Sequence, residues 1–431
     1  MPGRICCRVA WISKTARLGA VGSALVVAFS LVPLPDLHAS ELTHAAWVDA
    51  WGAAPHSSAA ETTPPSFQNR TLRMVLRLHA GGASVRIRLS NTFGTQPVRF
   101  GRVRVAVRDT GAALVPSTNR PVRFGGVNAV TVPAGAEVQS DPVALDVKPG
   151  HDLAVSMFVP GGTGIAPWHR SALQTSYVSV AGDHAGNSRA TSYPTTTSHW
   201  FFITAVSTRA ESTPGTVVAL GDSITDGSGS TGNANRRWPD VLSSRLRTRY
   251  QAAAPSVVNE GIAGNKVVTH SPRNGESAVA RLDRDVLQRS GLSHVVLLEG
   301  INDIRGGASA AGIVAGYDQI IDRVHARGAL IYGGTILPFK GTTGYSPALE
   351  KVRADVNAWI RTSGRFDGVI DFAAAVRDPA DPLRLRADYE RPDHLHPNDA
   401  GYAAMGNAVD LALFESRAEL SGVSGYRRRP A

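Results

Sequence analysis

The chain has 431 residues, enough for two or three domains of ordinary size. Apolar residues make up 43% of the chain and charged residues 19%, and these proportions exclude a disordered chain and a coiled coil. The formal net charge of +10 suggests a nucleic-acid partner only if the basic residues form a patch, so their positions decide the question.

The first 39 residues have the composition of a secretory signal peptide. Four basic residues fall within residues 1–17, residues 18–35 carry no charge, and a cleavage point is expected after Ala39. An uncleaved membrane anchor is the alternative, but the uncharged stretch is shorter than the ~20 apolar residues that a span needs. We therefore expect export, a mature chain that starts near Ser40, and no stable membrane span after cleavage.

Cleavage at this point changes the interpretation of the charge and of the cysteines. Residues 1–39 hold four basic residues and one acidic residue, so their removal lowers the formal charge from +10 to +7. The basic residues of the segment 419–431 are interpreted as a solvated C-terminal tail, and no basic patch interleaved with aromatic residues is evident. We expect no nucleic-acid partner. Both cysteines, Cys6 and Cys7, lie in the expected signal peptide, so the mature chain holds no disulfide.

The first half of the mature chain alternates apolar and polar residues with a period of two. Clusters of Gly, Pro, Asn and Asp separate four such runs, at residues 72–78, 85–89, 102–108 and 153–157. Short half-buried strands of this kind predict an antiparallel β-sandwich or jelly roll, which we assign to residues 40–210. The arginines that alternate with the apolar residues, such as Arg73 and Arg77, are interpreted as a solvated sheet face, with a surface for acidic glycans as the alternative.

The second half alternates continuous apolar strands with amphipathic helices. Strands are expected at residues 216–220, 256–259, 295–298, 329–332 and 369–372, and helices at 238–249, 313–324, 352–360 and 401–414. This alternation predicts a parallel sheet with helices on both faces, over residues 211–418. Ligands of such sheets bind at the carboxyl ends of the strands, so the functional residues are sought there.

Four polar clusters follow the expected strands or precede the last helix: residues 221–227, 259–265, 299–303 and 393–397. Taken singly, each has an ordinary structural interpretation as a helix cap or a turn. Taken together, they supply a serine, a glycine turn, an asparagine and an Asp-x-x-His sequence. These are the groups that acyl transfer requires: a nucleophile, its base, a carboxylate that orients the base, and donors for an oxyanion.

On these four clusters the chain resembles the SGNH hydrolases, also called GDSL-type esterases and lipases. The family's four sequence blocks occur here in order, with Ile224 where the first block usually has leucine, as Gly221-Asp222-Ser223-Ile224, Ile262-Ala263-Gly264-Asn265, Gly300-Ile301-Asn302-Asp303 and Asp393-His394-Leu395-His396-Pro397. The resemblance covers residues 214–416 and implies a flavodoxin-like parallel sheet. The sandwich ahead of it resembles that of a subgroup of secreted members, through Ser90–Gly94 and Arg237–Asp240.

The resemblance also implies the role of each site residue. Ser223 is the expected nucleophile, His396 its general base and then general acid, and Asp393 the carboxylate that orients His396. The oxyanion hole is expected to consist of the backbone N–H groups of Ser223 and Gly264 and the side-chain amide of Asn302. No metal or other cofactor is implied. The expected substrate is a small-molecule or polysaccharide ester, with a short acyl chain or an O-acetyl group on a polysaccharide.

Other interpretations stay open from the sequence. His394 is either a surface residue or part of the pocket, and Asp303 is expected to hold its loop through hydrogen bonds. Asp393, His394 and His396 have the side chains for a zinc site, although no His-Glu-x-x-His helix or cysteine accompanies them. The second class of function is a non-catalytic secreted glycan-binding protein that keeps the hydrolase fold. The short join between the halves suggests that the sandwich packs against the hydrolase and shapes its pocket rim.

Overall fold

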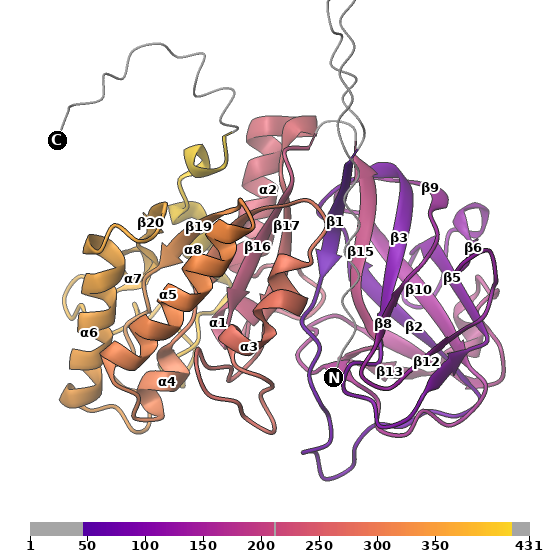
Figure 1. Cartoon of the computed structure of the whole chain (residues 1–431), viewed down its shortest axis with the longest axis horizontal. Helices are drawn as coiled ribbons and strands as arrows, with labels where there is room; N and C mark the ends of the chain where they lie inside the picture. Colours follow the sequence, from indigo (N-terminus) through magenta and orange to yellow (C-terminus); the bar gives the residue numbers. More distant parts are fainter. Residues whose placement is uncertain (1–45, 211–212, 416–431) are drawn as a thin grey trace, which may run out of the picture. The chain divides into compact units, whose positions relative to one another are not determined.

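The computed structural model describes residues 46–210 and 213–415 (Figure 1). The expected signal peptide at 1–39, with both cysteines, and the expected basic tail at 419–431 lie outside these residues. Within the described residues, no helix has the length and apolar character needed to cross a membrane.

The first half consists of two antiparallel sheets that share one core. One sheet has the order β1-β15-β3-β8, with β9 also paired to β3, and the other has the order β13-β12-β2-β10-β5-β6. Two short pairs accompany them, β11 with β14 and β4 with β7. The apolar residues of the predicted runs point inward from both sheets, and Val85, Ile87, Leu72 and Met74 are all fully buried in a common cluster. The predicted β-sandwich is therefore confirmed as an architecture.

The strands of this half have the following bounds: β1 (Ala46–Gly52), β2 (Arg70–Arg77), β3 (Gly82–Ser90), β4 (Val98–Phe100), β5 (Arg102–Val107), β6 (Arg120–Val122), β7 (Val130–Val132), β8 (Glu137–Gln139), β9 (Val143–Val147), β10 (Asp152–Val159), β11 (Trp168–His169), β12 (Ser176–Ala181), β13 (Thr195–Thr197), β14 (Trp200–Phe201) and β15 (Ile203–Ala210).

One part of the sandwich prediction was wrong: Arg73 does not belong to a solvated face. Its side chain is fully buried, and the guanidinium donates hydrogen bonds to Ser156 Oγ at 2.8 Å, the Ala112 carbonyl at 2.5 Å and the Asn187 carbonyl at 2.6 Å. The ring of Tyr193 lies under it, 3.8 Å from the guanidinium carbon to the ring centroid. Loops cover this second face of the sheet, and a buried arginine is tolerated there because its donors are satisfied.

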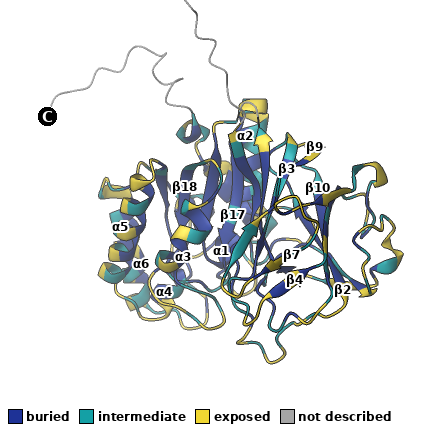
Figure 2. Cartoon of the chain, turned by 45° about the vertical axis from the view of Figure 1, so that its right-hand side comes forward, coloured by how far each residue is buried: buried dark blue, intermediate teal, exposed yellow. Residues whose placement is uncertain are grey.

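The second half is a five-stranded parallel sheet of order β17-β16-β18-β19-β20, which confirms the flavodoxin-like topology. In chain order its strands are β16 (Thr216–Gly221), β17 (Ser256–Gly261), β18 (Leu292–Leu298), β19 (Leu330–Gly334) and β20 (Gly368–Ile370). The central strands β16 and β18 are continuous apolar runs because both of their faces are buried, and Figure 2 shows β17 and β18 among the buried elements.

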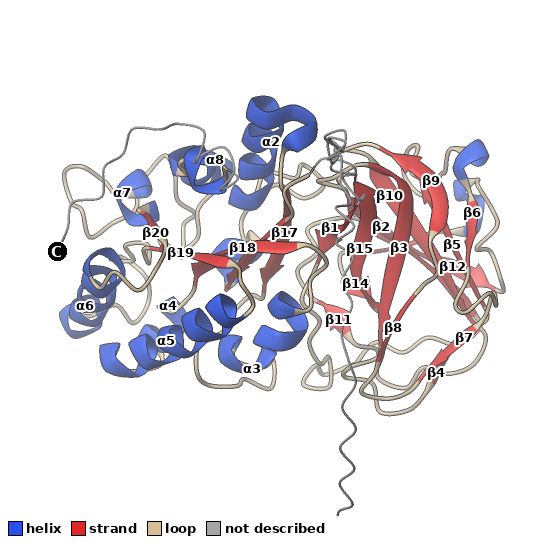
Figure 3. Cartoon of the chain, turned by 45° about the horizontal axis from the view of Figure 1, so that its top comes forward, coloured by secondary structure: helices blue, strands red, loops and turns tan. Residues whose placement is uncertain are grey.

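Helices cover both faces of this sheet, with α2, α7 and α8 on one side and α3, α5 and α6 on the other (Figure 3). Their bounds are α1 (Ser223–Asp226), α2 (Trp238–Tyr250), α3 (Ala278–Leu282), α4 (Ile301–Arg305), α5 (Ala310–Ala326), α6 (Pro347–Thr362), α7 (Phe372–Val376) and α8 (Asp399–Ala408). Two predicted bounds were wrong. The last strand ends at Ile370 because Asp371 caps α7, and the last helix ends at Ala408, with a separate 3-10 turn over Leu411–Phe414.

The strand β1 of the sandwich contacts the second half of the chain directly. The backbone N–H of Asp49 lies 3.1 Å from both the Ser290 carbonyl and Thr216 Oγ1. A Cβ atom at Gly52 would lie 2.3 Å from Glu260 Oε1, so any other residue here would displace the Glu260 carboxylate. The described residues 46–210 and 213–415 belong to one compact unit, in agreement with the expectation that the sandwich packs against the second half.

One buried arginine joins the two halves at this junction. Arg289 Nη2 lies 2.8 Å from Glu260 Oε2 and Nη1 donates to the Thr204 carbonyl at 2.9 Å, while Nη1 also lies 3.9 Å from Asp49 Oδ2. The side chains of Arg289, Glu260 and Asp49 are at most 1% exposed. The guanidinium thus balances buried carboxylates contributed by both halves of the chain.

Candidate active site

Three side chains from distant loops meet at the carboxyl edge of the parallel sheet. Ser223 opens the one-turn helix α1 directly after β16, and Asp393 and His396 lie in the segment before α8. His396 Nε2 lies 2.9 Å from Ser223 Oγ, and His396 Nδ1 lies 2.7 Å from Asp393 Oδ2. The structure therefore places the predicted serine, histidine and aspartate in one hydrogen-bonded chain.

Asp393 is fixed by its neighbours in the chain. Its Oδ1 accepts hydrogen bonds from the backbone N–H groups of Leu395 at 2.9 Å and His396 at 3.0 Å, while Oδ2 faces the His396 ring. Partial burial favours the neutral acid, but these three hydrogen bonds outweigh it and hold the pKa of Asp393 below its ordinary value. An ionised Asp393 keeps the hydrogen of His396 on Nδ1, which leaves Nε2 free to accept a proton from Ser223.

The short helix α1 presents Ser223 from a capped first turn. The Asp222 side chain accepts a hydrogen bond from the Ile224 N–H at 2.9 Å, and Gly227 ends the helix with φ of +99°. Burial, with the nearby carboxylates of Asp303 and Asp226, raises the pKa of Asp222 to about 7 against the opposing Ile224 bond and Arg281. The role of Asp222 that the structure shows is that of a helix cap, through its hydrogen bond with the Ile224 N–H.

Gly264 and Asn302, the two residues expected to complete the oxyanion hole with Ser223, line one pocket. Gly264 has φ of +78°, and a Cβ atom there would lie 2.5 Å from Asn274 Nδ2, so both the backbone conformation and the space require glycine. Asn302 Nδ2 donates one hydrogen to the Asn265 carbonyl at 2.9 Å, and an amide nitrogen carries a second hydrogen for another acceptor. Both residues line the same pocket of about 300 Å³.

Asp303 holds the neighbouring loop, as expected from the sequence. Its carboxylate accepts hydrogen bonds from the backbone N–H groups of Val267 at 2.8 Å and Val268 at 3.4 Å. Burial raises the pKa of Asp303, against these two bonds and the charge of Lys266. Through this carboxylate, helix α4, which contains Asn302, is tied to the loop that follows Gly264.

The side chain of His394 contacts a different residue from those that His396 contacts. It adopts a left-handed backbone conformation with φ of +56°, and its Nδ1 lies 2.8 Å from Glu390 Oε1. The ring is partly exposed. Among residues 46–210 and 213–415, no three His, Cys, Asp or Glu side chains are arranged to hold a metal ion, so the zinc interpretation of Asp393, His394 and His396 finds no geometric support.

Sequence reasoning missed Arg281, a fully buried cation behind the site. Its guanidinium donates to the carbonyls of Gly221 at 3.0 Å and Glu260 at 2.6 Å, and to Asn265 Oδ1 at 2.9 Å. It therefore ties together the carboxyl ends of β16 and β17 and the loop that leads into the pocket. The one available signal was a charged residue inside the apolar run 278–282.

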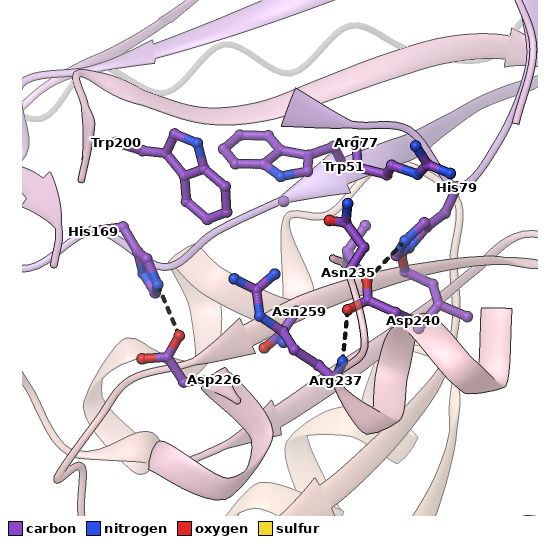
Figure 4. A pocket seen from close by; sticks show the side chains of 13 residues that line it. Trp51, Arg77, His79, His169, Trp200, Asp226, Asn235, Arg237, Asp240 and Asn259 are labelled. Carbon is purple, nitrogen blue, oxygen red and sulfur yellow. Dashed lines mark hydrogen bonds and ion pairs between the residues drawn. The ribbon is translucent and has the colours of Figure 1, made fainter. Parts of the chain in front are cut away.

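His169 of the sandwich was also missed, and it reaches the end of the serine helix (Figure 4). Its Nδ1 lies 2.9 Å from the Ala54 carbonyl and so carries a hydrogen, while its Nε2 lies 3.0 Å from Asp226 Oδ1. Asp226 Oδ2 accepts a hydrogen bond from the Ala263 N–H at 3.0 Å. Both side chains are 4% exposed. The sandwich thus contributes a buried support to α1 and to the residue before Gly264.

The space between Trp51, Trp200, His169 and Arg237 at this junction is not a substrate site (Figure 4). Its volume is about 20 Å³, which admits roughly one water molecule. The pocket beside Gly264 and Asn302 is lined by the hydrolase half alone among the described residues, and the sandwich reaches it through Arg170, which donates to Asn274 Oδ1 at 3.1 Å.

Comparison with known proteins agrees with this arrangement. Residues 219–404 match the model of the GDSL-like lipase/acylhydrolase family, whereas no curated protein matches the chain. This match supports a carboxylic ester hydrolase. More closely, residues 219–404, within the second half, are similar to the GDSL-like lipase/acylhydrolase family.

Solved structures similar to this half include three hydrolases. The psychrotrophic esterase EstA from Pseudoalteromonas sp. is 18% identical, with a TM-score of 0.36, over 48% of this chain and 98% of its own. A member of the lipolytic G-D-S-L family from Veillonella parvula is 18% identical, with a TM-score of 0.33, over 45% of this chain and 94% of its own. A variant of Axe2, an acetyl-xylooligosaccharide esterase from Geobacillus, is 18% identical, with a TM-score of 0.35, over 46% of this chain and 93% of its own.

Proposed function

We propose that this protein is an exported serine esterase that hydrolyses short-chain carboxylic esters, including O-acetyl groups of polysaccharides, through an acyl-enzyme on Ser223. The observation that carries the proposal is the hydrogen-bonded chain from Ser223 through His396 to Asp393. The distance from Ser223 Oγ to His396 Nε2 is 2.9 Å, and the distance from His396 Nδ1 to Asp393 Oδ2 is 2.7 Å. A serine hydroxyl with a base at this distance, oriented by a carboxylate, is the arrangement that activates it as a nucleophile.

In the first half of the reaction, Ser223 Oγ attacks the carbonyl carbon of the ester and its proton passes to His396 Nε2. Asp393, ionised and bonded to Nδ1–H, stabilises the imidazolium that forms. The backbone N–H groups of Ser223 and Gly264 and the free amide hydrogen of Asn302 bind the oxyanion. The intermediate collapses, His396 returns the proton to the leaving alcohol, and the acyl group stays on Ser223. In the second half, water attacks the acyl carbonyl and gives its proton to His396 Nε2. His396 then returns the proton to Ser223 Oγ as the carboxylic acid leaves.

Export is proposed from the amino-acid sequence alone. The basic residues before residue 18, the uncharged stretch at 18–35 and the cleavage point after Ala39 support it, and the mature protein begins near Ser40 in this proposal. The mature chain carries no cysteine, so it folds in an oxidising compartment without disulfide pairing.

The experiment that tests the proposal is covalent labelling by a fluorophosphonate during turnover of 4-nitrophenyl acetate. One equivalent of the reagent is expected to abolish hydrolysis and to appear, by mass spectrometry of the digested protein, on the peptide that contains Ser223. A chelator is expected to leave the rate unchanged, because no step uses a metal ion. Hydrolysis that survives full labelling, or a label on another residue, would contradict Ser223 as the nucleophile.

Replacing Asn302 with alanine is expected to lower kcat about 10²–10³-fold on 4-nitrophenyl acetate, the usual effect of removing one oxyanion donor. Asn302→Asp keeps the size of the side chain and removes the donating nitrogen, so it is expected to be at least as slow. Initial rates over a range of substrate concentrations separate kcat from KM. A rise in KM at unchanged kcat would mean that Asn302 binds the substrate without stabilising the oxyanion.

A further inference from the structure

The pocket beside the oxyanion donors has an unusual lining for an esterase that accepts long acyl chains. About 300 Å³ in volume, it is bounded by three glycines and by the side chains of Asn274, Asn302, Thr343, Lys266 and Arg305. None of these lining side chains is apolar and none is acidic. An apolar acyl chain gains little from burial against such groups, because the hydrophobic contribution scales with the apolar area removed from water.

The two cations in this lining make no close contact with a carboxylate in the part of the chain that the structure describes. Within residues 46–210 and 213–415, neither Lys266 nor Arg305 forms an ion pair with a carboxylate. The carboxylate whose charge acts on Lys266 is that of Asp303, which is 2% exposed and accepts hydrogen bonds from Val267 and Val268. Asp303 therefore lies behind the pocket wall.

The positions of the two cations are set by the folded backbone. The Lys266 carbonyl accepts a hydrogen bond from the Ala278 N–H at 2.9 Å, and a Cβ atom at Gly306 would lie 2.9 Å from Lys266 Nζ. Arg305 is the last residue of α4, the helix that carries Asn302. Both cations thus stand on the segments that supply Gly264 and Asn302.

We infer that this pocket binds the alcohol portion of the substrate and selects an alcohol that carries a carboxylate, that is, an O-acylated acidic saccharide. This inference rests on the proposed function. The polar lining suits a hydroxyl-rich ring in place of an acyl chain, and Lys266 and Arg305 supply the charge for the carboxylate. The esters of neutral saccharides and of fatty alcohols lack the group that these cations recognise.

The test compares two forms of one polymer, acetylated polygalacturonate with free carboxylates and the same polymer after methyl esterification of those carboxylates. The acetate released per unit time is expected to be about tenfold greater from the free acid at low salt, the combined effect of two exposed ion pairs. This preference is expected to shrink as the salt concentration rises.

The double variant K266Q/R305Q is expected to lose the preference, so that the ratio of the two rates falls to about one. A ratio of rates is independent of the amount of active protein, so partial misfolding does not imitate the result. The matched control R327Q/K351Q removes the same two charges from exposed positions outside the pocket and is expected to keep the tenfold ratio.

Two outcomes would overturn the inference and leave the proposed function standing. One is equal acetate release from the charged and the methylated polymer by the unaltered protein, together with hydrolysis of 4-nitrophenyl acetate. The other is a preference that survives in K266Q/R305Q. The absence of all ester hydrolysis, with no fluorophosphonate label on Ser223, would instead contradict the proposed function itself.

Discussion

Replacing Ser223 with alanine is expected to lower kcat on 4-nitrophenyl acetate by about 10⁴–10⁶-fold, because no other group of the site can form the acyl-enzyme. The hydroxyl lies 2.9 Å from His396 Nε2, so its removal leaves the base without a nucleophile to activate. His396→Ala is expected to have an effect of similar size, since an unactivated serine hydroxyl is a weak nucleophile at neutral pH.

The double variant Ser223→Ala/His396→Ala is the decisive measurement. Residues that act as one unit give strongly non-additive losses, so the double variant is expected to be about as slow as either single variant. Ser228→Ala is the matched control: Ser228 contacts the serine helix through its backbone N–H, 2.9 Å from the Ser223 carbonyl, and should keep nearly full activity. Two losses that simply multiply would mean that Ser223 and His396 act independently.

Replacing Arg289 with methionine is expected to lower the free energy of unfolding by about 3–5 kcal/mol at pH 9, where Glu260 is ionised, the usual cost of leaving a buried charge without its partner. Arg289 balances Glu260 at 2.8 Å and donates to the Thr204 carbonyl of the sandwich at 2.9 Å. Urea unfolding measures the loss. Arg327→Met, at an exposed helix end, is the control and is expected to change stability by less than about 0.5 kcal/mol.

The loss in Arg289→Met should also depend on pH. Burial raises the pKa of Glu260 to about 8 even though the Arg289 guanidinium lowers it. A raised pKa in the folded state means that this group's contribution to stability falls as pH rises toward that pKa, and without Arg289 the fall extends to higher pH. The variant should therefore lose more stability relative to the parent at pH 9 than at pH 6. A difference of less than about 1 kcal/mol at both pH values would contradict a charge-balancing role for Arg289.

The overall architecture followed from the sequence because periodicity reports burial. Runs with a period of two gave the strands of the sandwich, and the continuous apolar runs at 216–220 and 295–298 gave the central strands of the parallel sheet. The placement of Ser223 beside His396 at the carboxyl edge of the parallel sheet also followed, and Gly264 and Asn302 line one pocket. Their individual roles came from the family resemblance, and the experiments above test them.

The predictions that were wrong or missing have one physical cause. The sequence pattern of a segment does not show which other segments cover it. Arg73 alternates with apolar residues as a solvated residue would, yet loops near Ala112 and Asn187 cover it. His169 and Asp226 lie 57 positions apart, and neither belongs to a recurring pattern that would connect them. The apolar pair Val369 and Ile370 continues into Phe372 in sequence, but the side chain of Asp371 caps a helix there.

The first and last strands of the sandwich, β1 and β15, pair with each other, and this has a consequence for the order in which the two halves fold during synthesis. Every strand of the sandwich falls within residues 46–210, so this half is complete in sequence before β16 is synthesised. Because N-terminal units fold first as a chain emerges, we expect His169 to be already held by the Ala54 carbonyl when the serine helix forms. The sandwich is then a template that the catalytic half folds against, and the active-site helix is the part of the chain that meets it.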